Sequence, residues 1–209
     1  VDADYSQIEL RLLAHISGDE AMQAAFTSGT DIHTATAAQV FHVAPVEVTH
    51  EMRRRAKAVN FGIVYGISAF SLSQDIGVTV AEAKAYMEAY FATFPGVRRY
   101  MDDVVAKAKE QGYVETLFHR RRELPEIRSS NFNMRSFGER VALNMPIQGT
   151  AADIMKLAMI RVEQRLSGEG LAARLIMQVH DELIVECPAE EAPRVEALLQ
   201  EEMQGVARL

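Results

Sequence analysis

The spacing of apolar residues changes several times along the chain, and each change marks an element. VDAD at the start fits a short strand, and SQIELRLLAHISG then has the spacing of a helix that stops at Gly18. Residues 20–130 are mostly helical in pattern. Thr79 and Glu82 have the spacing of a capping box, which marks the start of a helix. That helix should end before Phe94-Pro95-Gly96, and the next helix should end at Gly112.

Two later segments have the pattern of strands. YVETLFHRRRELP predicts a short strand pair around a basic turn, and RLIMQVHDELIVECP predicts two antiparallel strands joined by a tight turn at His180-Asp181-Glu182. Between them, SFGERVALNMPIQGTAADIMKLAMIRVEQRL predicts two helices broken near Pro146, because an interior proline removes a donor and clashes with the preceding turn. The tail from Glu190 is helical and amphipathic. This order predicts an α+β fold with strands near both ends and a long helical insertion.

Composition narrows the class of protein. The 209 residues are 48% hydrophobic and 24% charged, which is typical of a globular domain. The net charge of -7 argues against general coating of nucleic acid or membranes, although local cation clusters can still bind. One cysteine excludes an internal disulfide framework and is typical of a reducing compartment. Without a secretory signal or an apolar run near the roughly 20 residues that span a bilayer, we expect no membrane partner.

The stretch RRRAKAVNFGIVYG, residues 53–66, concentrates cations beside aromatic residues. Positions four residues apart rotate by only about 40° on a helix and share one face. This places in one stripe Arg53, Lys57, Phe61 and Tyr65. Two cations followed by two rings match the phosphates and the base of a nucleoside triphosphate. A solvated basic turn with two core aromatic residues is the alternative. Gly62 and Gly66 indicate close approach of another chain to this helix.

Three acidic residues occupy the ends of predicted strands. Asp4 follows the first strand, and Asp181 and Glu182 lie at the tip of the last hairpin. Two converging carboxylates would repel unless a divalent cation lay between them, and Mg²⁺ prefers oxygen ligands. Turn residues that face water are the alternative interpretation. A fourth acidic residue, Glu9, could belong to the same site, but the start of a helix alone also explains it, because Ser6 and Glu9 have the spacing of a capping box.

Three segments of the chain closely resemble the three polymerase motifs of the DNA polymerase I family, family A, in the same order: DYSQIELR, RRRAKAVNFGIVYG and QVHDELIVE. DIHTATAAQVF, TLFHRRRELP and LNMPIQGTAADIMKLAM resemble the same family, so the resemblance spans nearly the whole chain. It implies an antiparallel palm sheet with packed helices from residues 1–18 and 131–209, and mostly helical fingers from residues 19–130.

The same resemblance implies a template-directed DNA polymerase that adds deoxynucleotides to a primer 3′-hydroxyl and releases pyrophosphate. Its partners would be primer-template DNA and deoxynucleoside triphosphates, and we expect a monomer in the cytoplasm of a bacterial or phage-infected cell. Two Mg²⁺ ions, which Mn²⁺ can replace, would be held by Asp4, Asp181 and the backbone carbonyl of Tyr5, with Glu182 nearby. They would activate the 3′-hydroxyl and stabilise the leaving pyrophosphate, to which Lys57 would donate a proton.

The resemblance also assigns the binding residues. The incoming nucleotide would contact Gln7, Glu9, His33, Arg53, Lys57, Phe61 and Tyr65. Among these, Glu9 would exclude a ribose 2′-hydroxyl, and Phe61, which lacks a phenolic hydroxyl, would make dideoxynucleotides poor substrates. The primer and template would contact Arg140, Asn144, Gln148 and His180.

The chain also departs from the family pattern. His119 stands where many relatives have glycine, which leaves the geometry of that turn open. We expect a fragment of a longer polymerase, with the thumb, the early palm strands and any nuclease domain before Val1 and the end of the palm missing. Two alternatives remain: an inactive fragment that binds nucleotide or DNA, and a relative of single-subunit RNA polymerases, against which Glu9 speaks.

Overall fold

The structure is a computed structural model that describes residues 1–209, and its backbone divides into two compact units. Residues 1–8 and 148–209 form unit 1, and residues 9–147 form unit 2. Unit 1 carries a three-stranded sheet, and unit 2 consists mainly of helices with one two-stranded sheet. The prediction of an α+β fold, with an antiparallel sheet and a mostly helical insertion, is confirmed. Each unit is described below by itself.

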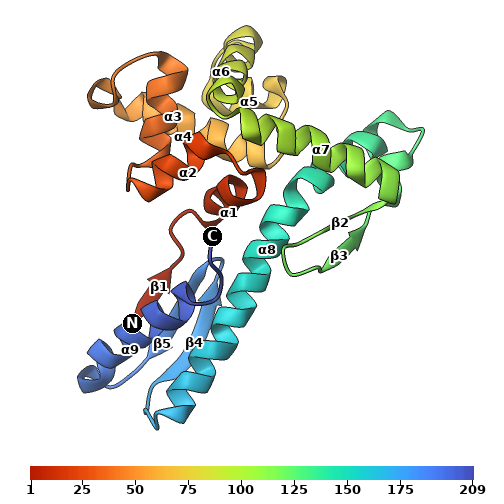
Figure 1. The fold of residues 1–209 in the computed structure, drawn as a ribbon. Coiled ribbons are helices and arrows are strands. Elements are labelled where there is room, and N and C mark those ends of the chain that lie inside the picture. The colour runs from red at the N-terminus through yellow and green to blue at the C-terminus, as the bar shows by residue number, and fades with distance from the viewer. The chain divides into compact units, whose positions relative to one another are not determined.

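The sheet of unit 1 joins the two ends of the chain (Figure 1). Its strands are β1 (Asp2–Asp4), β4 (Arg174–Val179) and β5 (Glu182–Glu186), in the order β1-β5-β4. All neighbours are antiparallel, and the register places Glu182 opposite both Asp4 and Val179. The predicted tight hairpin is therefore confirmed, and β5 is its central strand.

Every second residue of β5 points into the core of unit 1. Leu183 and Val185 are buried, whereas the residues between and beside them are more exposed, as expected of a strand with one covered face. The cluster around them includes Val195 and Leu198 of α9 (Ala192–Gln204), which follows the 3₁₀ turn η3 (Ala189–Glu191). Helix α8 adds further buried residues to the cluster: Ala158, Val162 and Leu166.

Helix α8 (Phe132–Gly168) runs without interruption through Pro146, so the prediction of two separate helices was wrong. A proline removes one backbone donor and crowds the preceding turn, but the remaining hydrogen bonds of a long helix can carry the chain past it. Burial favours this outcome, because Pro146 and Ile147 are both buried. None of the helices, α8 included, combines the length and the apolar character that a bilayer crossing requires.

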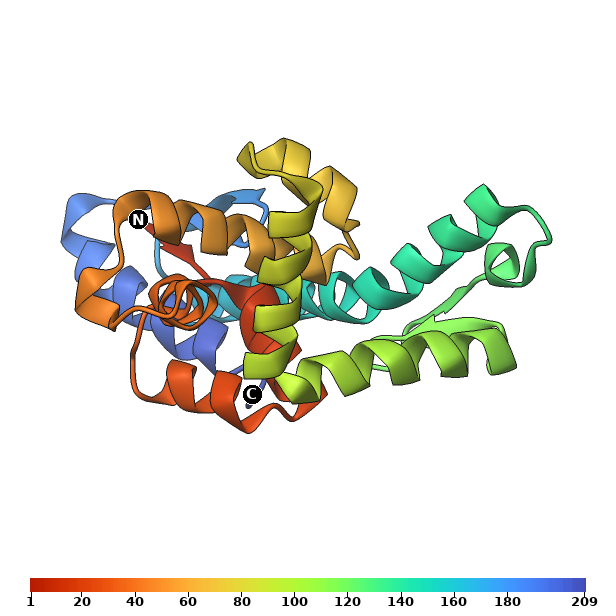
Figure 2. The same ribbon diagram turned by 90° about the horizontal axis from the view of Figure 1, so that it is seen from above.

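Unit 2 is built mainly from helices (Figure 2). They are α1 (Ile8–Ser17), α2 (Glu20–Thr27), α3 (Ile32–Phe41), the 3₁₀ turn η1 (Pro45–Glu47), α4 (His50–Val64), α5 (Ala69–Ile76), α6 (Val80–Thr93) and α7 (Pro95–Gln111). At the start of each helix from α2 to α6, the side-chain oxygen of the capping residue accepts a hydrogen bond from a backbone N–H; these residues are Asp19, Asp31, Thr49, Ser68 and Thr79. Such caps are typical of helix starts.

The predicted boundaries around α6 and α7 are confirmed. Thr79 and Glu82 form a complete capping box, and α6 ends at Thr93. Gly112 follows α7 in the left-handed conformation, at φ 87°. Asp19 links two helix starts, because its carboxylate accepts from Met22 N at 2.9 Å and from Gly96 N at 2.8 Å. A side chain at Gly96 would meet Asp19 at 2.9 Å, so only glycine allows this contact.

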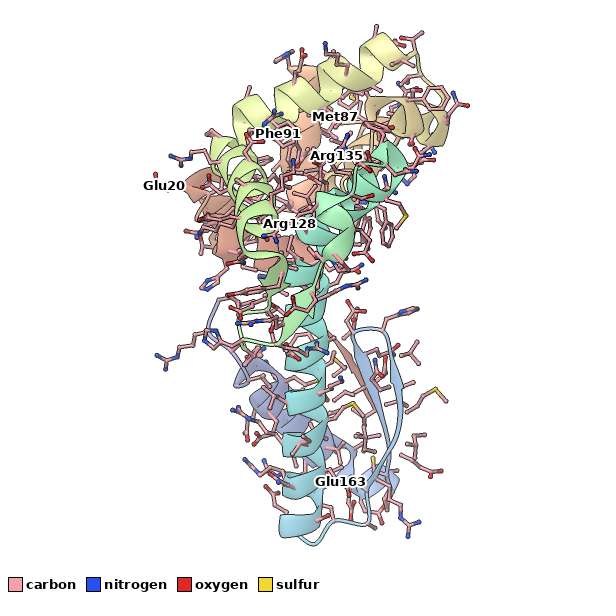
Figure 3. All side chains as sticks on the ribbon, turned by 90° about the vertical axis from the view of Figure 1, so that its right-hand side faces the viewer. Glu20, Met87, Phe91, Arg128, Arg135 and Glu163 are labelled. Atoms are coloured by element: carbon pink, nitrogen blue, oxygen red, sulfur yellow. The ribbon has the colours of Figure 1, made fainter.

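A small sheet follows α7, as predicted. Strands β2 (Tyr113–Glu115) and β3 (Arg121–Glu123) pair antiparallel and lead into the 3₁₀ turn η2 (Pro125–Arg128). Arg128, labelled in Figure 3, donates to the backbone oxygens of Lys109 and Glu110 in the last turn of α7. A cation there satisfies carbonyl groups that the helix leaves without partners.

The start of α1 differs from the prediction. The helix begins at Ile8, and Gln7 before it has φ 55°, in the left-handed region. This φ lies outside the helical region, so a non-helical residue separates Ser6 from the first residue of α1. The other end agrees, because α1 ends at Ser17 and Gly18 has φ 60°.

Candidate functional site

Unit 1 brings two of the predicted acidic residues together. Asp4 is the last residue of β1, and Asp181 lies in the turn between β4 and β5. The backbone joins them, because Tyr5 N donates to Asp181 O at 3.0 Å. Desolvation raises the pKa of Asp4, and so do the charge of Asp181 and a side-chain hydrogen bond to it. The two carboxylates therefore share one space, where a cation would relieve their repulsion.

The donor atoms of this pair suit a hard cation. Carboxylate and carbonyl oxygens are what Mg²⁺ takes from proteins, usually with water and substrate phosphates as the remaining ligands. No third acidic, histidine or cysteine side chain joins the pair to form a closed metal cluster. Tyr5 is fixed beside it, because Tyr5 Oη donates to Met203 O at 2.6 Å and burial raises the pKa of Tyr5 to about 12. The arrangement fits an open Mg²⁺ site with few protein ligands.

Four other predicted residues lie in unit 1. Glu182 is half-buried and opposes Asp4 in the sheet. His180 is exposed with φ 51°, which the tight turn before Asp181 requires. Gln7 is half-buried and precedes α1, and Gln148 is exposed on α8.

Unit 2 carries the predicted stripe on α4. Arg53, Lys57 and Phe61 are four residues apart within the helix, and Lys57 Nζ lies 5.9 Å from the centre of the Phe61 ring. Tyr65 and Gly66 lie beyond its last residue, so the expectation of one helix through residue 66 was wrong. Gly66 has φ 65°, and the bonds from Gly66 N to Ile63 O and from Ile67 N to Gly62 O close the helix as a Schellman motif.

The two glycines are explained within this chain. A Cβ at Gly62 would lie 2.7 Å from Cγ2 of Ile67, which follows the helix, so no other chain is needed to account for the close approach. Gly66 has a left-handed backbone, and a Cβ there would lie 3.0 Å from Leu143. A cavity of about 620 Å³ adjoins this turn and is lined in part by Phe61, Tyr65 and Arg140.

Arg53 is held by a residue outside the helix. Its Nε and Nη2 donate to the two carboxylate oxygens of Asp31, at 2.8 and 2.9 Å. Asp31 also caps α3, where its Oδ2 accepts from Thr34 N at 2.8 Å. The hydrogen bond from Arg53 is the main reason that the pKa of Asp31 lies well below its usual range. Asp31 is therefore an ionised carboxylate that orients Arg53.

His33 lies behind the stripe. It is buried on α3, and its ring centre lies 5.8 Å from that of Phe61. Nδ1 of His33 lies 3.0 Å from Nδ2 of the buried Asn60, whose Oδ1 lies 3.1 Å from the Thr36 hydroxyl. Burial lowers the pKa of His33, and the charges of Arg53 and Lys57 lower it further against the opposing effect of Asp31. His33 is thus a buried, neutral imidazole.

Glu9 and Tyr65 are joined by a hydrogen bond. Tyr65 Oη donates to Glu9 Oε2 at 2.9 Å, which connects the first turn of α1 with the end of α4. Arg140 and Asn144 share one face of α8, and Arg140 is exposed whereas Asn144 is half-buried.

The structure therefore gathers the predicted residues into two sets, one in each unit. The roles of Asp31, Thr36 and Asn60 were missed by the sequence analysis. Asp31 could be identified as a helix cap, but its partner is 22 residues away. For Asn60 the sequence gives only a weak indication of a buried polar contact, because it is a polar residue between Val59 and Phe61.

Paired carboxylates are typical of divalent-cation sites, and a helix with cations beside aromatic rings is typical of sites for phosphorylated ligands. The sequence profile of DNA polymerase family A matches residues 1–209, so the chain belongs to DNA polymerase family A.

Individual relatives are similar over the whole chain. Over 207 residues it is 58% identical to DNA polymerase I of Geobacillus stearothermophilus and 60% identical to DNA polymerase I of Bacillus subtilis (strain 168). Each match covers 99% of this chain and 24% of the relative, so the chain spans about a quarter of their length. Among solved structures, the POL domain of Pol1 from M. smegmatis in complex with DNA primer-template and dNTP has a TM-score of 0.96 and 48% identity, over 100% of this chain and 37% of that one.

Proposed function

We propose that this chain is the palm and fingers portion of a template-directed DNA polymerase that extends a primer 3′-hydroxyl with deoxynucleotides and releases pyrophosphate. Residues 1–18 and 131–209 would belong to the palm, and residues 19–130 to the fingers. The observation that carries the proposal is the meeting of Asp4 and Asp181, from opposite ends of a chain that belongs to DNA polymerase family A. The similar M. smegmatis structure, with primer-template DNA and dNTP, supports these as the partners.

Asp4, Asp181 and the carbonyl of Tyr5 would hold two Mg²⁺ ions, for which Mn²⁺ is the natural substitute. Bound there, the ions would supply the positive charge that activates the primer 3′-hydroxyl and stabilises the developing charge on the phosphates. The chain's own contribution is to hold the two carboxylates side by side, at the end of a strand and in a tight hairpin, where a cation would relieve their repulsion. Glu182, opposite Asp4, adds negative potential beside them.

The stripe on α4 would bind the incoming nucleotide. Arg53 and Lys57 would contact its phosphates, and Phe61 would stack beside the sugar and base. Asp31 supports this role, since it fixes two of the Arg53 donors and leaves Nη1 for phosphate. Lys57 is exposed and forms no ion pair in this structure, so it is available to donate a proton to the leaving pyrophosphate. His33 and Gln7 would complete the triphosphate contacts.

The Glu9–Tyr65 pair would select the sugar. The hydrogen bond from Tyr65 holds the Glu9 carboxylate in one place, where its bulk would exclude a 2′-hydroxyl. Deoxynucleotides are then preferred over ribonucleotides, which distinguishes this proposal from an RNA polymerase.

Four polar residues would line the primer and template: Arg140, Asn144, Gln148 and His180. Amide and guanidinium donors can contact minor-groove acceptors that all correct base pairs share, so they test the geometry of a pair without reading its sequence.

Primer extension by the complete protein that carries this chain tests the proposal. With Mg²⁺ and four deoxynucleotides we expect extension that ribonucleotides do not support and that Asp181→Ala abolishes. Binding of nucleotide without extension would instead identify a binding protein. Efficient extension with ribonucleotides would identify an RNA polymerase.

A further inference from the structure

Tyr5 directly follows Asp4 and donates hydrogen bonds from both its backbone and its side chain. The backbone N–H donates to Asp181 O at 3.0 Å, and the hydroxyl donates to Met203 O at 2.6 Å. The ring between these two donors is half-buried and packs against the core of unit 1. Tyr5 is therefore held from two directions, by the hairpin turn that carries Asp181 and by the end of α9.

The end of α9 needs the donor that Tyr5 supplies. The last carbonyl groups of a helix have no partner within that helix. In α9, Met203 O accepts from the Tyr5 hydroxyl, and Gly205 O, just beyond the helix, accepts from Arg161 Nη1 at 2.7 Å. Two side chains from outside α9 thus fix its C-terminal turn, and one of them belongs to the neighbour of Asp4.

Helix α9 is a well-packed support for this contact. It lies beside β1 (Figure 1), and its buried side chains belong to the core of unit 1. Strand β1, in contrast, is three residues long and pairs only with β5. A short strand at the edge of a sheet has few ladder hydrogen bonds, so contacts outside the sheet contribute much to its position. Tyr5 supplies such a contact immediately after the last residue of β1.

The Tyr5 backbone also contacts both acidic residues of the pair. Desolvation and Asp181 raise the pKa of Asp4, and a hydrogen bond from the Tyr5 backbone to the Asp4 carboxylate opposes this rise. The same residue donates to Asp181 O. A displaced Tyr5 backbone would therefore change how the two carboxylates lie relative to each other.

From this geometry we propose that the Tyr5 side chain is a positioning residue for the divalent-cation site. Its hydroxyl, fixed on α9, holds the Tyr5 backbone so that the carboxylates of Asp4 and Asp181 keep the spacing that a shared cation requires. This proposal rests on the proposed function, since it takes the carboxylate pair to bind a divalent cation. Mg²⁺ demands near-ideal octahedral geometry with ligands at about 2.0–2.1 Å, so a displaced ligand weakens its binding.

Mn²⁺ binding to the nucleotide-free complete protein tests the proposal without catalysis. The EPR signal of free Mn²⁺ measures the dissociation constant, and a double variant, Asp4→Asn with Asp181→Asn, identifies the binding that belongs to the pair. Tyr5→Phe removes the hydroxyl and keeps the ring. It should raise the dissociation constant at the pair about fivefold, the effect expected of one lost hydrogen bond.

Primer extension adds a second measurement. The Mg²⁺ concentration that gives half-maximal extension should rise in Tyr5→Phe by a similar factor, about fivefold. The KM for deoxynucleotide at saturating Mg²⁺ should stay within about twofold of the wild type, because the hydroxyl acts on the cation site and not on the nucleotide.

Val195→Ala is the matched control. Val195 is fully buried on α9, so its truncation should destabilise unit 1 at least as much as the loss of the Tyr5 hydroxyl, while the bond to Met203 O stays in place. Under conditions where urea unfolding shows both variants folded, its Mn²⁺ dissociation constant should remain within about twofold of the wild type. Equal weakening in Val195→Ala and Tyr5→Phe would reveal a general effect of stability and would overturn the proposal.

Two further results separate this proposal from the proposed function. Mn²⁺ that binds the pair equally well in the wild type and in Tyr5→Phe would overturn the positioning role and leave the cation site intact. A wild type that binds no more Mn²⁺ than the double variant would contradict the cation site itself, and with it the proposed function as well.

Discussion

Asp31 and Arg53 form a two-point contact in which the guanidinium Nε and Nη2 donate to both carboxylate oxygens, at 2.8 and 2.9 Å. The same carboxylate caps α3, so one residue fixes the start of that helix and the direction of an arginine on α4. The side chains of Arg53 and Asp31 are 42% and 34% exposed. Water screens such a pair, so its main effect is to orient Arg53 rather than to stabilise the fold.

Replacement of Asp31 should weaken nucleotide binding. Asp31→Asn keeps the cap but loses one acceptor for Arg53, and we expect the nucleotide KM to rise about threefold, equivalent to roughly 0.6 kcal/mol. Asp31→Ala should raise it about tenfold and lower the free energy of unfolding by about 1 kcal/mol, because the cap is also lost. Steady-state extension and urea unfolding measure these changes. A lower KM in Asp31→Asn would show that the carboxylate competes with phosphate instead of orienting Arg53.

The acid dependence of stability should report the same contact. Because the pKa of Asp31 is depressed in the folded protein, its contribution is present above its unfolded pKa of about 4 and is lost as the pH falls toward the folded pKa. Asp31→Asn should therefore lose less stability than the wild type between about pH 4 and pH 2. The free energy of unfolding of both proteins, measured across this pH range, tests the prediction. If the two values fall in parallel, the depressed pKa of Asp31 is contradicted.

Asp4→Asn should stabilise the protein when no divalent cation is present. The pKa of Asp4 is raised, so its ionised form is destabilising at neutral pH, and the penalty is relieved as the pH falls through the folded pKa. The gain should be small, about 0.5 kcal/mol, because Asp4 is exposed. Thermal unfolding in EDTA measures it. Mg²⁺ should raise the Tm of the wild type more than that of the variant, and a variant less stable than the wild type in EDTA would count against the carboxylate pair.

His119→Gly should stabilise the β2–β3 hairpin. Thr116 N donates to Arg120 O, and His119 N to Thr116 O, each at 3.0 Å, while His119 has φ 61°, as in hairpin loops that favour glycine. Removing the left-handed strain should add roughly 0.5–1 kcal/mol to the free energy of unfolding. Gly77→Ala is the matched control, since Gly77 has φ 65° with nothing within 4 Å of an added Cβ, and it should lose about as much. A loss in His119→Gly would show that the imidazole makes a contact worth more than the strain.

Phe61→Tyr should increase the use of dideoxynucleotides. A phenolic hydroxyl on this half-buried ring would replace the missing 3′-hydroxyl of the substrate, so the ratio of dideoxy to deoxy incorporation should rise about tenfold or more. Phe26→Tyr, at another half-buried ring, should leave the ratio unchanged. An unchanged ratio in Phe61→Tyr would remove Phe61 from the nucleotide site.

Local signals in the sequence predicted most of the elements. The capping box at Thr79 and Glu82, the stop at Gly112 and the hairpin around His180 and Asp181 all depend on residues within a few positions of one another. The stripe was also visible, because positions four apart on a helix share a face whatever lies around them.

The features that the sequence did not predict depend on contacts between residues far apart in the chain. Pro146 stays inside α8, and its burial is a tertiary property that a propensity argument cannot see. Gln7 takes a left-handed φ that a non-glycine residue rarely adopts. The partners of Arg53 and His33 come from packing of α3 on α4, across 22 and 27 residues. Motif resemblance named Arg53 and His33 but not the side chains that hold them.

The central claim is that Asp4 and Asp181 act as one unit, and a double-mutant cycle on the rate of single-nucleotide addition tests it most directly. Asp4→Asn and Asp181→Asn should each lower the rate by about 10³-fold or more, and the double variant should be little slower than either, because each single change already disables the pair. Glu186→Gln, an exposed acid at the far end of β5, should stay within about twofold of the wild type. Losses that multiply in the double variant, or a single variant within about tenfold of the wild type, would contradict the claim.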